Sequence, residues 1–201
     1  MIVTMALTIA MPLALFLAYV VGSIDFAVVV ARMHGVDIRE VGSGNPGASN
    51  VLRTLGRLPA AMVFLGDMMK GVVGAAIGFF LTGDPNWGFA GGFAAVVGHC
   101  YPIFHRFKGG KGVATATGVL LFTVPIVALI DAVIWAVLAR VTKTASISSL
   151  VVMGLTIPLV LWLGIEVEGL VWLLLTIALI VWRHRANIQR MVRGDEQKVP
   201  T

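Results

Sequence analysis

The chain has 201 residues, of which 58% are hydrophobic and 12% are charged, and its formal net charge is +5. Its mean hydropathy is +0.95, well above the range of soluble domains. A soluble chain of this length could not bury so much apolar surface, so the composition excludes a soluble globular protein and indicates a polytopic membrane protein. Cys100 is the only cysteine, which excludes an intrachain disulfide and a cysteine-rich metal site.

The apolar segments predict an all-α polytopic membrane protein, one domain over residues 1–201. The first segment has no Lys or Arg before Arg32 and is too long for a cleaved signal peptide, so we expect it to be retained. Seven transmembrane helices are expected, at about 5–31, 59–81, 87–105, 113–124, 126–140, 146–164 and 168–184.

The basic residues predict the orientation of these spans. All Lys and Arg except Lys70 lie in four connections, at 32–57, 106–111, 140–143 and the tail from 183. The intervening connections contain Asp84, Glu166 and Glu168 and no basic residue. Because basic connections are typical of the cytoplasmic side, we expect the N-terminus outside and the C-terminus in the cytoplasm.

This orientation requires an even number of crossings within residues 112–139. One helix there would be an overlong span of roughly 42 Å. The sequence Thr123-Val124-Pro125 offers a break, since proline disrupts a continuing helix. We therefore favour two short spans, the first sheltered by its neighbours. A six-span topology with one long helix is the main alternative, and it would place the basic tail on the opposite side.

The first polar stretch is residues 42–53, GSGNPGASNVLR. Its glycines fit a dinucleotide fingerprint, but that motif has meaning only in a soluble βαβ unit, so nucleotide binding is rejected. What remains is a backbone that can approach a ligand closely and form an anion nest, with hydroxyl, amide and guanidinium donors beside it. The alternative is a tight turn that only connects two spans. The candidate binding residues are Gly42, Ser43, Gly44, Asn45, Gly47, Asn50 and Arg53.

The second stretch is residues 107–115, FKGGKGVAT. It resembles a phosphate loop but lacks the first glycine of Walker A and the Ser or Thr after the lysine, so no nucleoside triphosphate is implied. A helix is expected from Val113. Gly109, Gly110 and Gly112 would then present backbone N–H groups and a positive helix end to an anion, with Lys111 beside them. The alternative is that the lysines contact lipid headgroups.

The third stretch is residues 182–188, WRHRANI, at the end of the last span. Arginines in this position are typical anchors at the cytoplasmic surface, and we interpret them so. His184 and Asn187 would share one face of a helix. Neither is needed for anchoring, so both are candidate functional residues.

Within the spans, Asp67 and Lys70 lie three residues apart on one helical face. A buried ion pair in a membrane is costly and often functional, but here we favour a neutralised pair that locks two helices or supports the site. The repeats Gly74-x-x-x-Gly78 and Gly88-x-x-x-Gly92 predict close helix packing.

Together, GSGNPGASNVLR, HCYPIFHRFKGGKGVATATG and WRHRANIQR resemble the PlsY family of bacterial acyl-phosphate:glycerol-3-phosphate acyltransferases, in order, at matching spacings and over nearly the whole chain. The resemblance implies a seven-span inner-membrane enzyme with its site near the cytoplasmic face. It would transfer an acyl group from acyl phosphate to the 1-hydroxyl of glycerol 3-phosphate, the first step of phospholipid synthesis. The products would be 1-acylglycerol 3-phosphate (lysophosphatidic acid) and phosphate.

The resemblance also implies roles for individual residues. Glycerol 3-phosphate would bind the glycine loop Gly109–Gly112, and Glu196 matches a glutamate of structural importance. Ser49 stands where the family commonly has threonine, and it keeps the hydroxyl. The expected catalytic residues are Ser43, Arg53, Lys111, His184 and Asn187.

The residues are compatible with this chemistry. Acyl phosphate is already activated, so no covalent enzyme intermediate is required, and no nucleophile–base–acid constellation is evident. The site must hold two anionic substrates with the glycerol hydroxyl against the acyl carbonyl. The proton acceptor stays open between His184, Ser43 and a substrate phosphate oxygen. We favour the phosphate, with His184 orienting the acceptor. We expect no metal, cofactor, nucleic acid or obligate protein partner, only the substrates and the bilayer.

A membrane transporter of phosphorylated metabolites is the alternative function. It would need anion-binding loops too, but also polar residues through the bilayer midplane, and no internal repeat is visible here. Conventional acyltransferases of this pathway need His-x₄-Asp, which is absent from the sequence. The aspartate cluster of CDP-alcohol phosphotransferases is absent as well.

Overall fold

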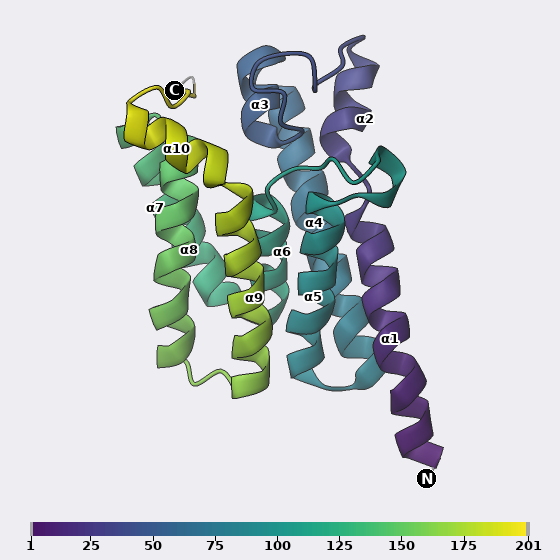
Figure 1. Cartoon of the computed structure of the whole chain (residues 1–201). Coiled ribbons are helices and arrows are strands. Elements are labelled where there is room, and N and C mark those ends of the chain that lie inside the picture. Colours follow the sequence, from purple (N-terminus) through teal and green to yellow (C-terminus); the bar gives the residue numbers. More distant parts are fainter. Residues whose placement is uncertain (1, 200–201) are drawn as a thin grey trace.

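The computed structural model describes residues 2–199, and this part of the chain folds into ten α-helices and one 3-10 turn, with no β-strand (Figure 1). This confirms the expected all-α fold. The helices are α1 (Ile2–Gly22), α2 (Phe26–Met33), α3 (Ala48–Thr54), α4 (Arg57–Thr82), α5 (Pro85–Cys100), α6 (Val113–Thr123), α7 (Pro125–Thr142), α8 (Ala145–Trp162), α9 (Val167–Arg183) and α10 (Arg185–Arg193), and the 3-10 turn is Ile103–His105.

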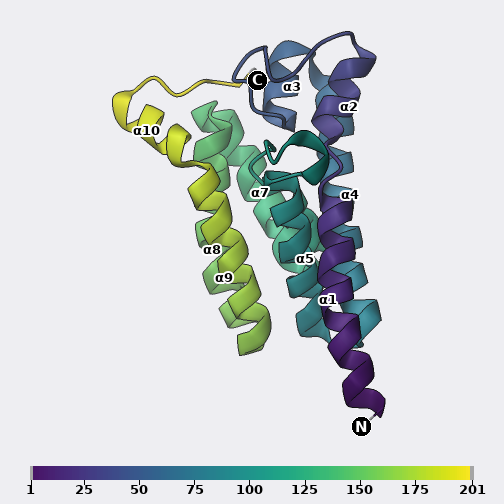
Figure 2. The ribbon, with the colours of Figure 1, turned by 45° about the vertical axis from the view of Figure 1, so that its right-hand side comes forward.

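The long helices run side by side, and the short helices α2, α3 and α10 gather at one end of the bundle together with the loop that follows α5 (Figures 1 and 2). We call this end the polar end. The first described residues lie at the opposite end. Four segments within residues 2–199 are long and apolar enough to cross a membrane: 9–33, α4, α7 and α8. The bent pair α9–α10 makes a fifth if it counts as one span.

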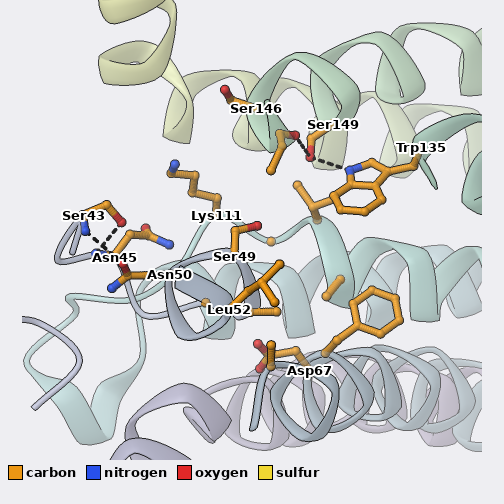
Figure 3. Close-up of a pocket in the computed structure, with 18 of the residues that line it drawn as sticks. Ser43, Asn45, Ser49, Asn50, Leu52, Asp67, Lys111, Trp135, Ser146 and Ser149 are labelled. Carbon is orange, nitrogen blue, oxygen red and sulfur yellow. Dashed lines mark hydrogen bonds between the residues drawn. The ribbon is translucent and has the colours of Figure 1, made fainter. Parts of the chain in front are cut away.

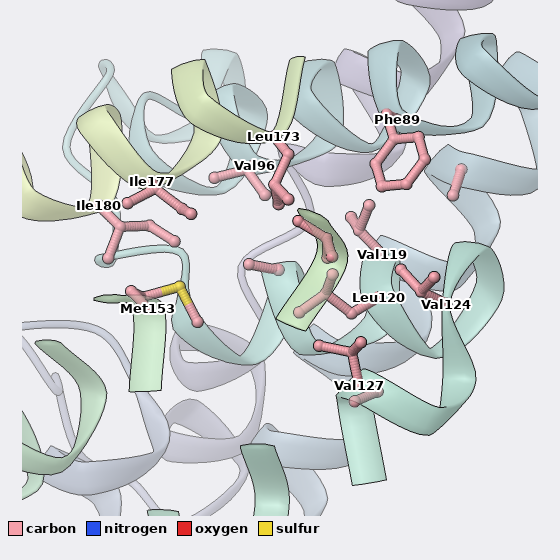
Figure 4. Packing of buried hydrophobic residues seen from close by; sticks show 14 of the residues in the cluster. Phe89, Val96, Val119, Leu120, Val124, Val127, Met153, Leu173, Ile177 and Ile180 are labelled. Atoms are coloured by element: carbon pink, nitrogen blue, oxygen red, sulfur yellow. The ribbon is translucent and has the colours of Figure 1, made fainter. Parts of the chain in front are cut away.

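The break between α6 and α7 lies where the sequence predicts it. α6 ends at Thr123, and α7 begins at Pro125, whose missing N–H costs nothing in a first turn. α6 has only 11 residues and is surrounded by α4, α5 and α7. Its Val119 and Leu120 belong to the main apolar core, together with side chains of α5, α7, α8 and α9 (Figure 4). The short helix is therefore sheltered by its neighbours, as expected.

Two predicted spans end earlier than the sequence suggests. The first is interrupted between α1 and α2 at Ser23–Asp25, because the Asp25 carboxylate accepts the Val28 N–H (3.2 Å) and caps a new helix. The third ends at Cys100 instead of 105, because Pro102 disfavours a helical conformation at the residue before it.

Both glycine repeats allow close helix packing, as predicted: the repeat on α4 packs against α5, and the repeat on α5 packs against Val119 and Thr123 of α6. A methyl group added at Gly78 would collide with the Trp87 carbonyl, and one added at Gly74 with the Ala95 side chain. Backbones that approach this closely gain dispersion contacts, which drive helix association where the solvent is itself apolar. α4 thereby becomes the central helix, packed against α1, α5 and α6.

Candidate active site

All three polar stretches line one cavity of about 430 Å³ at the polar end (Figure 3). Ser43, Asn45 and Arg53 come from the first, Lys111 and Gly112 from the second, and the last contributes the pair predicted from its spacing, His184 and Asn187. The cavity continues between α4, α6, α7 and α8. Residues separated by more than a hundred positions in sequence thus share one site.

The first loop is held by Asn50, which is 1% exposed. Its Oδ1 accepts the Ser43 N–H (2.8 Å), and its Nδ2 donates to the carbonyls of Ile38 (3.1 Å) and Val41 (3.0 Å). Because both ends of the amide are engaged within the loop, Asn50 braces the turn, while its role as a ligand stays a prediction. Gly42 (φ +59°) turns the chain directly over this amide, a conformation that favours glycine.

Arg53 lies on α3 and holds the C-terminal tail. Its Nε donates to the Lys198 carbonyl (2.8 Å) and its Nη2 to the Gln197 carbonyl (3.1 Å). Figure 2 shows the segment after α10 crossing the polar end towards α3. Arg53 does border the cavity, but its guanidinium is occupied by backbone carbonyls. A bidentate phosphate contact through these two nitrogens would have to displace the tail, and the catalytic role of Arg53 stays a prediction.

The glycine loop is also used differently from the prediction. The N–H groups of Gly109 and Gly110 donate to the carbonyls of Cys100 (3.2 Å) and His99 (3.0 Å) at the end of α5. They are therefore not available to an anion. Arg183 fixes the other side of the loop: its Nη2 donates to the Gly109 carbonyl (2.7 Å) and its Nε to the Gly110 carbonyl (3.0 Å), while its guanidinium lies over Tyr101.

The donors that face the cavity begin at Lys111. No helical acceptor exists for the N–H groups of the first turn of α6, which follows Gly112 (φ +88°), so this turn presents positive partial charge beside the Lys111 ammonium. Figure 3 shows the Lys111 side chain between the Ser43 loop and Ser146 of α8. Burial lowers the pKa of Lys111 to about 8, with the nearby arginines adding to the effect and Glu196 opposing it.

The third stretch bends by 51° at His184, between α9 and α10. His184 is 2% exposed, and its Nδ1 faces the Ile180 carbonyl at 2.8 Å. The ring therefore donates through Nδ1 and leaves Nε2 as the atom able to accept a proton or a hydrogen bond. Because the bend turns α10 across the bundle, Asn187 also reaches the cavity.

Glu196 in the tail ties three elements together. Its carboxylate accepts hydrogen bonds from Asn187, from Ser146 (2.9 Å) and from the Arg190 guanidinium (2.8 Å). Burial opposes its ionisation, but these hydrogen bonds hold the pKa of Glu196 below its usual value. The structural importance implied for Glu196 agrees with these contacts. Ser146 and Arg190 are site residues that the sequence analysis missed.

The predicted pair Asp67–Lys70 forms on α4, with Nζ 2.8 Å from Oδ1. Lys70 also donates to the Ile24 carbonyl (2.7 Å) at the break between α1 and α2, so the pair locks these helices. It supports the site as well: Asp67 lines the cavity, and the Nδ1 of His99 on α5 faces its Oδ1 at 3.4 Å.

The inner part of the cavity is mostly apolar. It is lined by Ala60, Ala61, Phe64, Val113, Ala114, Ala132, Trp135 and Val152. Two polar contacts lie beside this surface: the Trp135 indole donates to Ser149 (3.0 Å), and Thr156 donates to Oδ2 of Asp131 (2.7 Å), whose Oδ1 has no hydrogen-bond partner among the described residues. Such a surface suits a hydrocarbon chain.

The outer part of the site is strongly cationic. A second recess of about 530 Å³ shares Ser43, Asn45, Lys111, Asn187 and Arg190 with the cavity. Arg39, Lys108, Arg183 and Arg185 also line it. Clustered cations at a mouth attract anions from solution.

A family model described as glycerol-3-phosphate acyltransferase matches residues 12–194. The chain belongs to the glycerol-3-phosphate acyltransferase family. It is 40% identical over 184 residues to a protein of that name from Halorhodospira halophila (91% of this chain, 93% of the relative) and 44% identical over 184 residues to one from Thioalkalivibrio sulfidiphilus (90% of each).

Solved structures of this acyltransferase family superpose closely on the chain. PlsY (YgiH), an integral membrane glycerol 3-phosphate acyltransferase, matches in its glycerol 3-phosphate form with a TM-score of 0.89 and 38% identity, over 95% of this chain and 96% of that one. Its lysophosphatidic acid form matches with a TM-score of 0.88 at the same identity and coverage. This confirms the resemblance to the PlsY family and an integral membrane fold.

For this acyltransferase family member, Arg183 is the clearest correction to the sequence analysis. Interpreted there as a membrane anchor, it instead supports the glycine loop through two carbonyls. The sequence shows only that Arg183 precedes the candidate residue His184. An arginine at this position could equally support a loop or anchor the helix at the membrane surface.

Proposed function

We propose that this chain transfers a fatty acyl group from acyl phosphate to the 1-hydroxyl of glycerol 3-phosphate, releasing lysophosphatidic acid and phosphate. The family, and the solved relatives in glycerol 3-phosphate and lysophosphatidic acid forms, support the acceptor and the product. Acyl phosphate as the acyl donor is supported by the sequence resemblance. It is also supported by the cationic side chains and N–H groups that line the site.

One observation supports this function above all: a cationic, donor-rich region and an apolar groove belong to the same cavity. A lysophospholipid has the same two parts, a phosphate head and a hydrocarbon chain. The glycerol phosphate would lie at Lys111 and the first turn of α6. The acyl chain would extend between α4 and α7. The acyl carbonyl would then meet the glycerol 1-hydroxyl near Ser43, His184 and Asn187.

The reaction is a direct transfer. The glycerol hydroxyl oxygen attacks the acyl carbonyl carbon, the bond between that carbon and the phosphate oxygen breaks, and phosphate leaves. Lys111 and the Ser43 hydroxyl stabilise the charge that develops on the carbonyl and phosphate oxygens. Asn187, held by Glu196, and His184 orient the acceptor.

We also propose seven spans in one domain, with the N-terminus outside and the site near the cytoplasmic face of a bacterial inner membrane. The convergence of the three basic stretches on one cavity supports this topology, because one long helix over residues 112–139 would separate the third stretch from the others. Single cysteines in a Cys100→Ser background test it. A membrane-impermeant reagent should label Thr123, which is half-buried, from outside when it is replaced by cysteine, and Lys143, which is exposed, from inside. Cytoplasmic labelling at 123 would contradict the topology.

The activity is tested with purified protein, acyl phosphate and glycerol 3-phosphate, with lysophosphatidic acid detected by mass spectrometry. Acyl phosphate should support product formation, and acyl-CoA should not. If no product forms, counter-flow of labelled glycerol 3-phosphate into proteoliposomes tests the transporter alternative, and uptake without acylation would overturn the proposal.

A further inference from the structure

Asp131 is a carboxyl group inside an apolar helix, and no step of the proposed reaction uses it. It lies on α7, one of the segments long and apolar enough to cross a membrane, and it is 4% exposed. It lines the cavity together with Ala132 and Trp135, whereas Val133 and Val137 of the same helix are exposed. An acidic side chain within a membrane span is costly, so Asp131 is a candidate functional residue.

The fold leaves this carboxyl only partly paired. Oδ2 accepts a hydrogen bond from the Thr156 hydroxyl of α8 (2.7 Å), and the same hydroxyl faces the Val152 carbonyl of its own helix (2.9 Å), so one proton serves two acceptors. Oδ1 is buried and has no hydrogen-bond partner among the described residues. Within residues 2–199, no cation forms an ion pair with Asp131, whereas Asp67 of the same cavity has the Lys70 ammonium at 2.8 Å.

Helix packing does not account for a carboxyl at this position. The contact with Thr156 joins α7 to α8, but a neutral hydroxyl at position 131 would make the same contact without the cost of burying a carboxyl. The second oxygen adds nothing to the packing, since it has no partner in the described part of the chain. An oxygen of this kind beside a substrate cavity points to a ligand group.

Asp131 lies deep in the cavity, away from the reacting groups. Ser146 marks the level of the reaction, because it shares the Glu196 carboxylate with Asn187. Thr156, the partner of Asp131, follows Ser146 by ten residues on α8, which at about 1.5 Å per residue is a depth of roughly 15 Å. An extended hydrocarbon chain advances about 1.3 Å per carbon, because its bonds of about 1.5 Å alternate in direction. The acyl chain would therefore bring roughly its twelfth carbon to this depth.

A chain that covers Asp131 determines what the carboxyl can bond. Plain hydrocarbon excludes water and offers no hydrogen-bond donor, so the second oxygen stays unpaired, which is costly for a buried polar group. A hydroxyl group on the chain at this depth would supply the missing donor. The carboxyl can turn to meet it, because the terminal torsion of an aspartate side chain is broad.

We propose that Asp131 is a specificity-determining residue for the acyl donor. It favours chains that carry a hydroxyl group at about the twelfth carbon over plain chains of the same length. The chain hydroxyl donates to one carboxyl oxygen, while Thr156 bonds the other. Asp131 takes no part in the bonds that form and break. This assignment rests on the proposed function, because it places the acyl chain in the groove between α4 and α7.

Kinetics with four acyl phosphates and purified protein test the proposal. Octadecanoyl phosphate is compared with 12-hydroxyoctadecanoyl phosphate, and 3-hydroxyoctadecanoyl phosphate is the control whose hydroxyl lies too close to the carbonyl to reach Asp131. Decanoyl phosphate, which ends before Asp131, is the reference for each preparation, so a general loss of activity cancels from the ratios. In wild type, kcat/KM for the 12-hydroxy donor should exceed that for the plain donor about ten-fold, as expected when a buried acceptor gains a donor.

Three variants separate recognition from packing. Asp131→Leu should abolish the preference for the 12-hydroxy donor, because the chain hydroxyl then meets only hydrocarbon, and it should leave the effect of the 3-hydroxyl as in wild type. Asp131→Asn should keep most of the preference, since an amide also offers an acceptor and a donor. Thr156→Val removes the same contact between α7 and α8 but leaves the carboxyl, so the preference should persist.

Several outcomes would overturn the proposal. Wild type that does not prefer the 12-hydroxy donor would do so, and this measurement needs no substitution. So would an unchanged preference in Asp131→Leu, or an equal loss in Thr156→Val and Asp131→Leu, because the carboxyl would then only pack α7 against α8. If wild type forms no lysophosphatidic acid from any of the four donors, the proposed function fails instead.

A binding measurement keeps the role of Asp131 testable without turnover. The product 1-(12-hydroxyoctadecanoyl)glycerol 3-phosphate should raise the Tm of wild type more than 1-octadecanoylglycerol 3-phosphate does, and the difference should disappear in Asp131→Leu. The same melting curves show whether each variant is folded. No difference in wild type, or a difference that persists in Asp131→Leu, would overturn the proposal whether or not the enzyme is active.

Discussion

Arg183 and Gly110 are joined by a 3.0 Å hydrogen bond from the guanidinium to the loop carbonyl, so the end of α9 determines where the glycine loop lies. A second hydrogen bond, to the Gly109 carbonyl (2.7 Å), makes the contact two-pronged. The loop N–H groups are already bonded to α5. The loop is thus held from both sides before any ligand arrives, which favours tight binding because little order is lost on association.

We expect Arg183→Lys to lower kcat/KM about ten-fold or more. A lysine keeps the charge but lacks the planar, pre-organised fork that bonds the two carbonyls and lies flat over Tyr101. Steady-state kinetics should be compared with Arg193→Lys, an exposed position on α10 that should be close to wild type. If kcat/KM is the same in the two variants, Arg183 only anchors the helix and does not support the site.

Replacing Ser43 by alanine should remove most activity and leave thermal stability close to wild type. Ser43 lies in an exposed part of the first loop, and its backbone N–H, which alanine keeps, makes the structural bond to Asn50 (2.8 Å). Turnover and a melting curve on the same preparation check this, with Ser49→Thr as the control that retains a hydroxyl. Near-normal turnover would show that the Ser43 hydroxyl has no catalytic role.

The two lysines of the second stretch should differ. Lys111 lines the cavity, whereas Lys108 is exposed and borders only the outer recess. Lys111→Ala should reduce kcat/KM for glycerol 3-phosphate about thirty-fold or more, since removing one partner of a desolvated charge pair costs about 2–5 kcal/mol. Lys108→Ala should cost several-fold at most, and the effect should shrink at high salt. Steady-state kinetics of both variants at two salt concentrations check this prediction. If the two variants lose the same activity, the stretch is a diffuse basic patch and not a specific phosphate site.

The affinity for glycerol 3-phosphate should depend on pH through Lys111. Because burial lowers the pKa of Lys111 to about 8, its side chain in the free site is charged below pH 8 and loses this charge as the pH rises further, while the arginines stay charged. KM should therefore increase above pH 8. In Lys111→Arg the residue stays charged, so the increase should disappear even if the absolute KM is worse. A wild-type KM that stays flat to pH 9.5 would contradict this assignment.

Glu196 should stabilise the fold only when it is ionised. Its pKa is lower in the folded state than in the unfolded chain, so its contribution is complete above the unfolded value and is lost as the pH falls through the folded value. Glu196→Gln should therefore lower the free energy of unfolding at neutral pH by about 1.5–3 kcal/mol, typical for hydrogen bonds to a charged group. The difference should vanish in acid. Asp195→Asn, at an exposed neighbour, is the control for thermal melts across pH 3–8.

The amino-acid sequence by itself determined the class of fold, the α6–α7 break and the three stretches that form the site. These features depend on local chemistry: apolar runs long enough to span a bilayer, a proline that disrupts a helix, and glycines beside cations. His184 and Asn187 were identified for the same reason, since a spacing of three places them on one side of a helix.

Only the tertiary structure decided which donors face a ligand. Gly109 and Gly110 look like phosphate binders in sequence, but the end of α5 takes their N–H groups. Arg53 looks like a phosphate clamp in sequence, and in the fold two of its nitrogens bond the tail carbonyls of residues 197 and 198. Asp67 and His99 lie on different helices, and no spacing in the sequence connects them. Hydrogen-bond donors choose partners by distance and direction, and these were set by the packing of α4, α5 and α9 around α6.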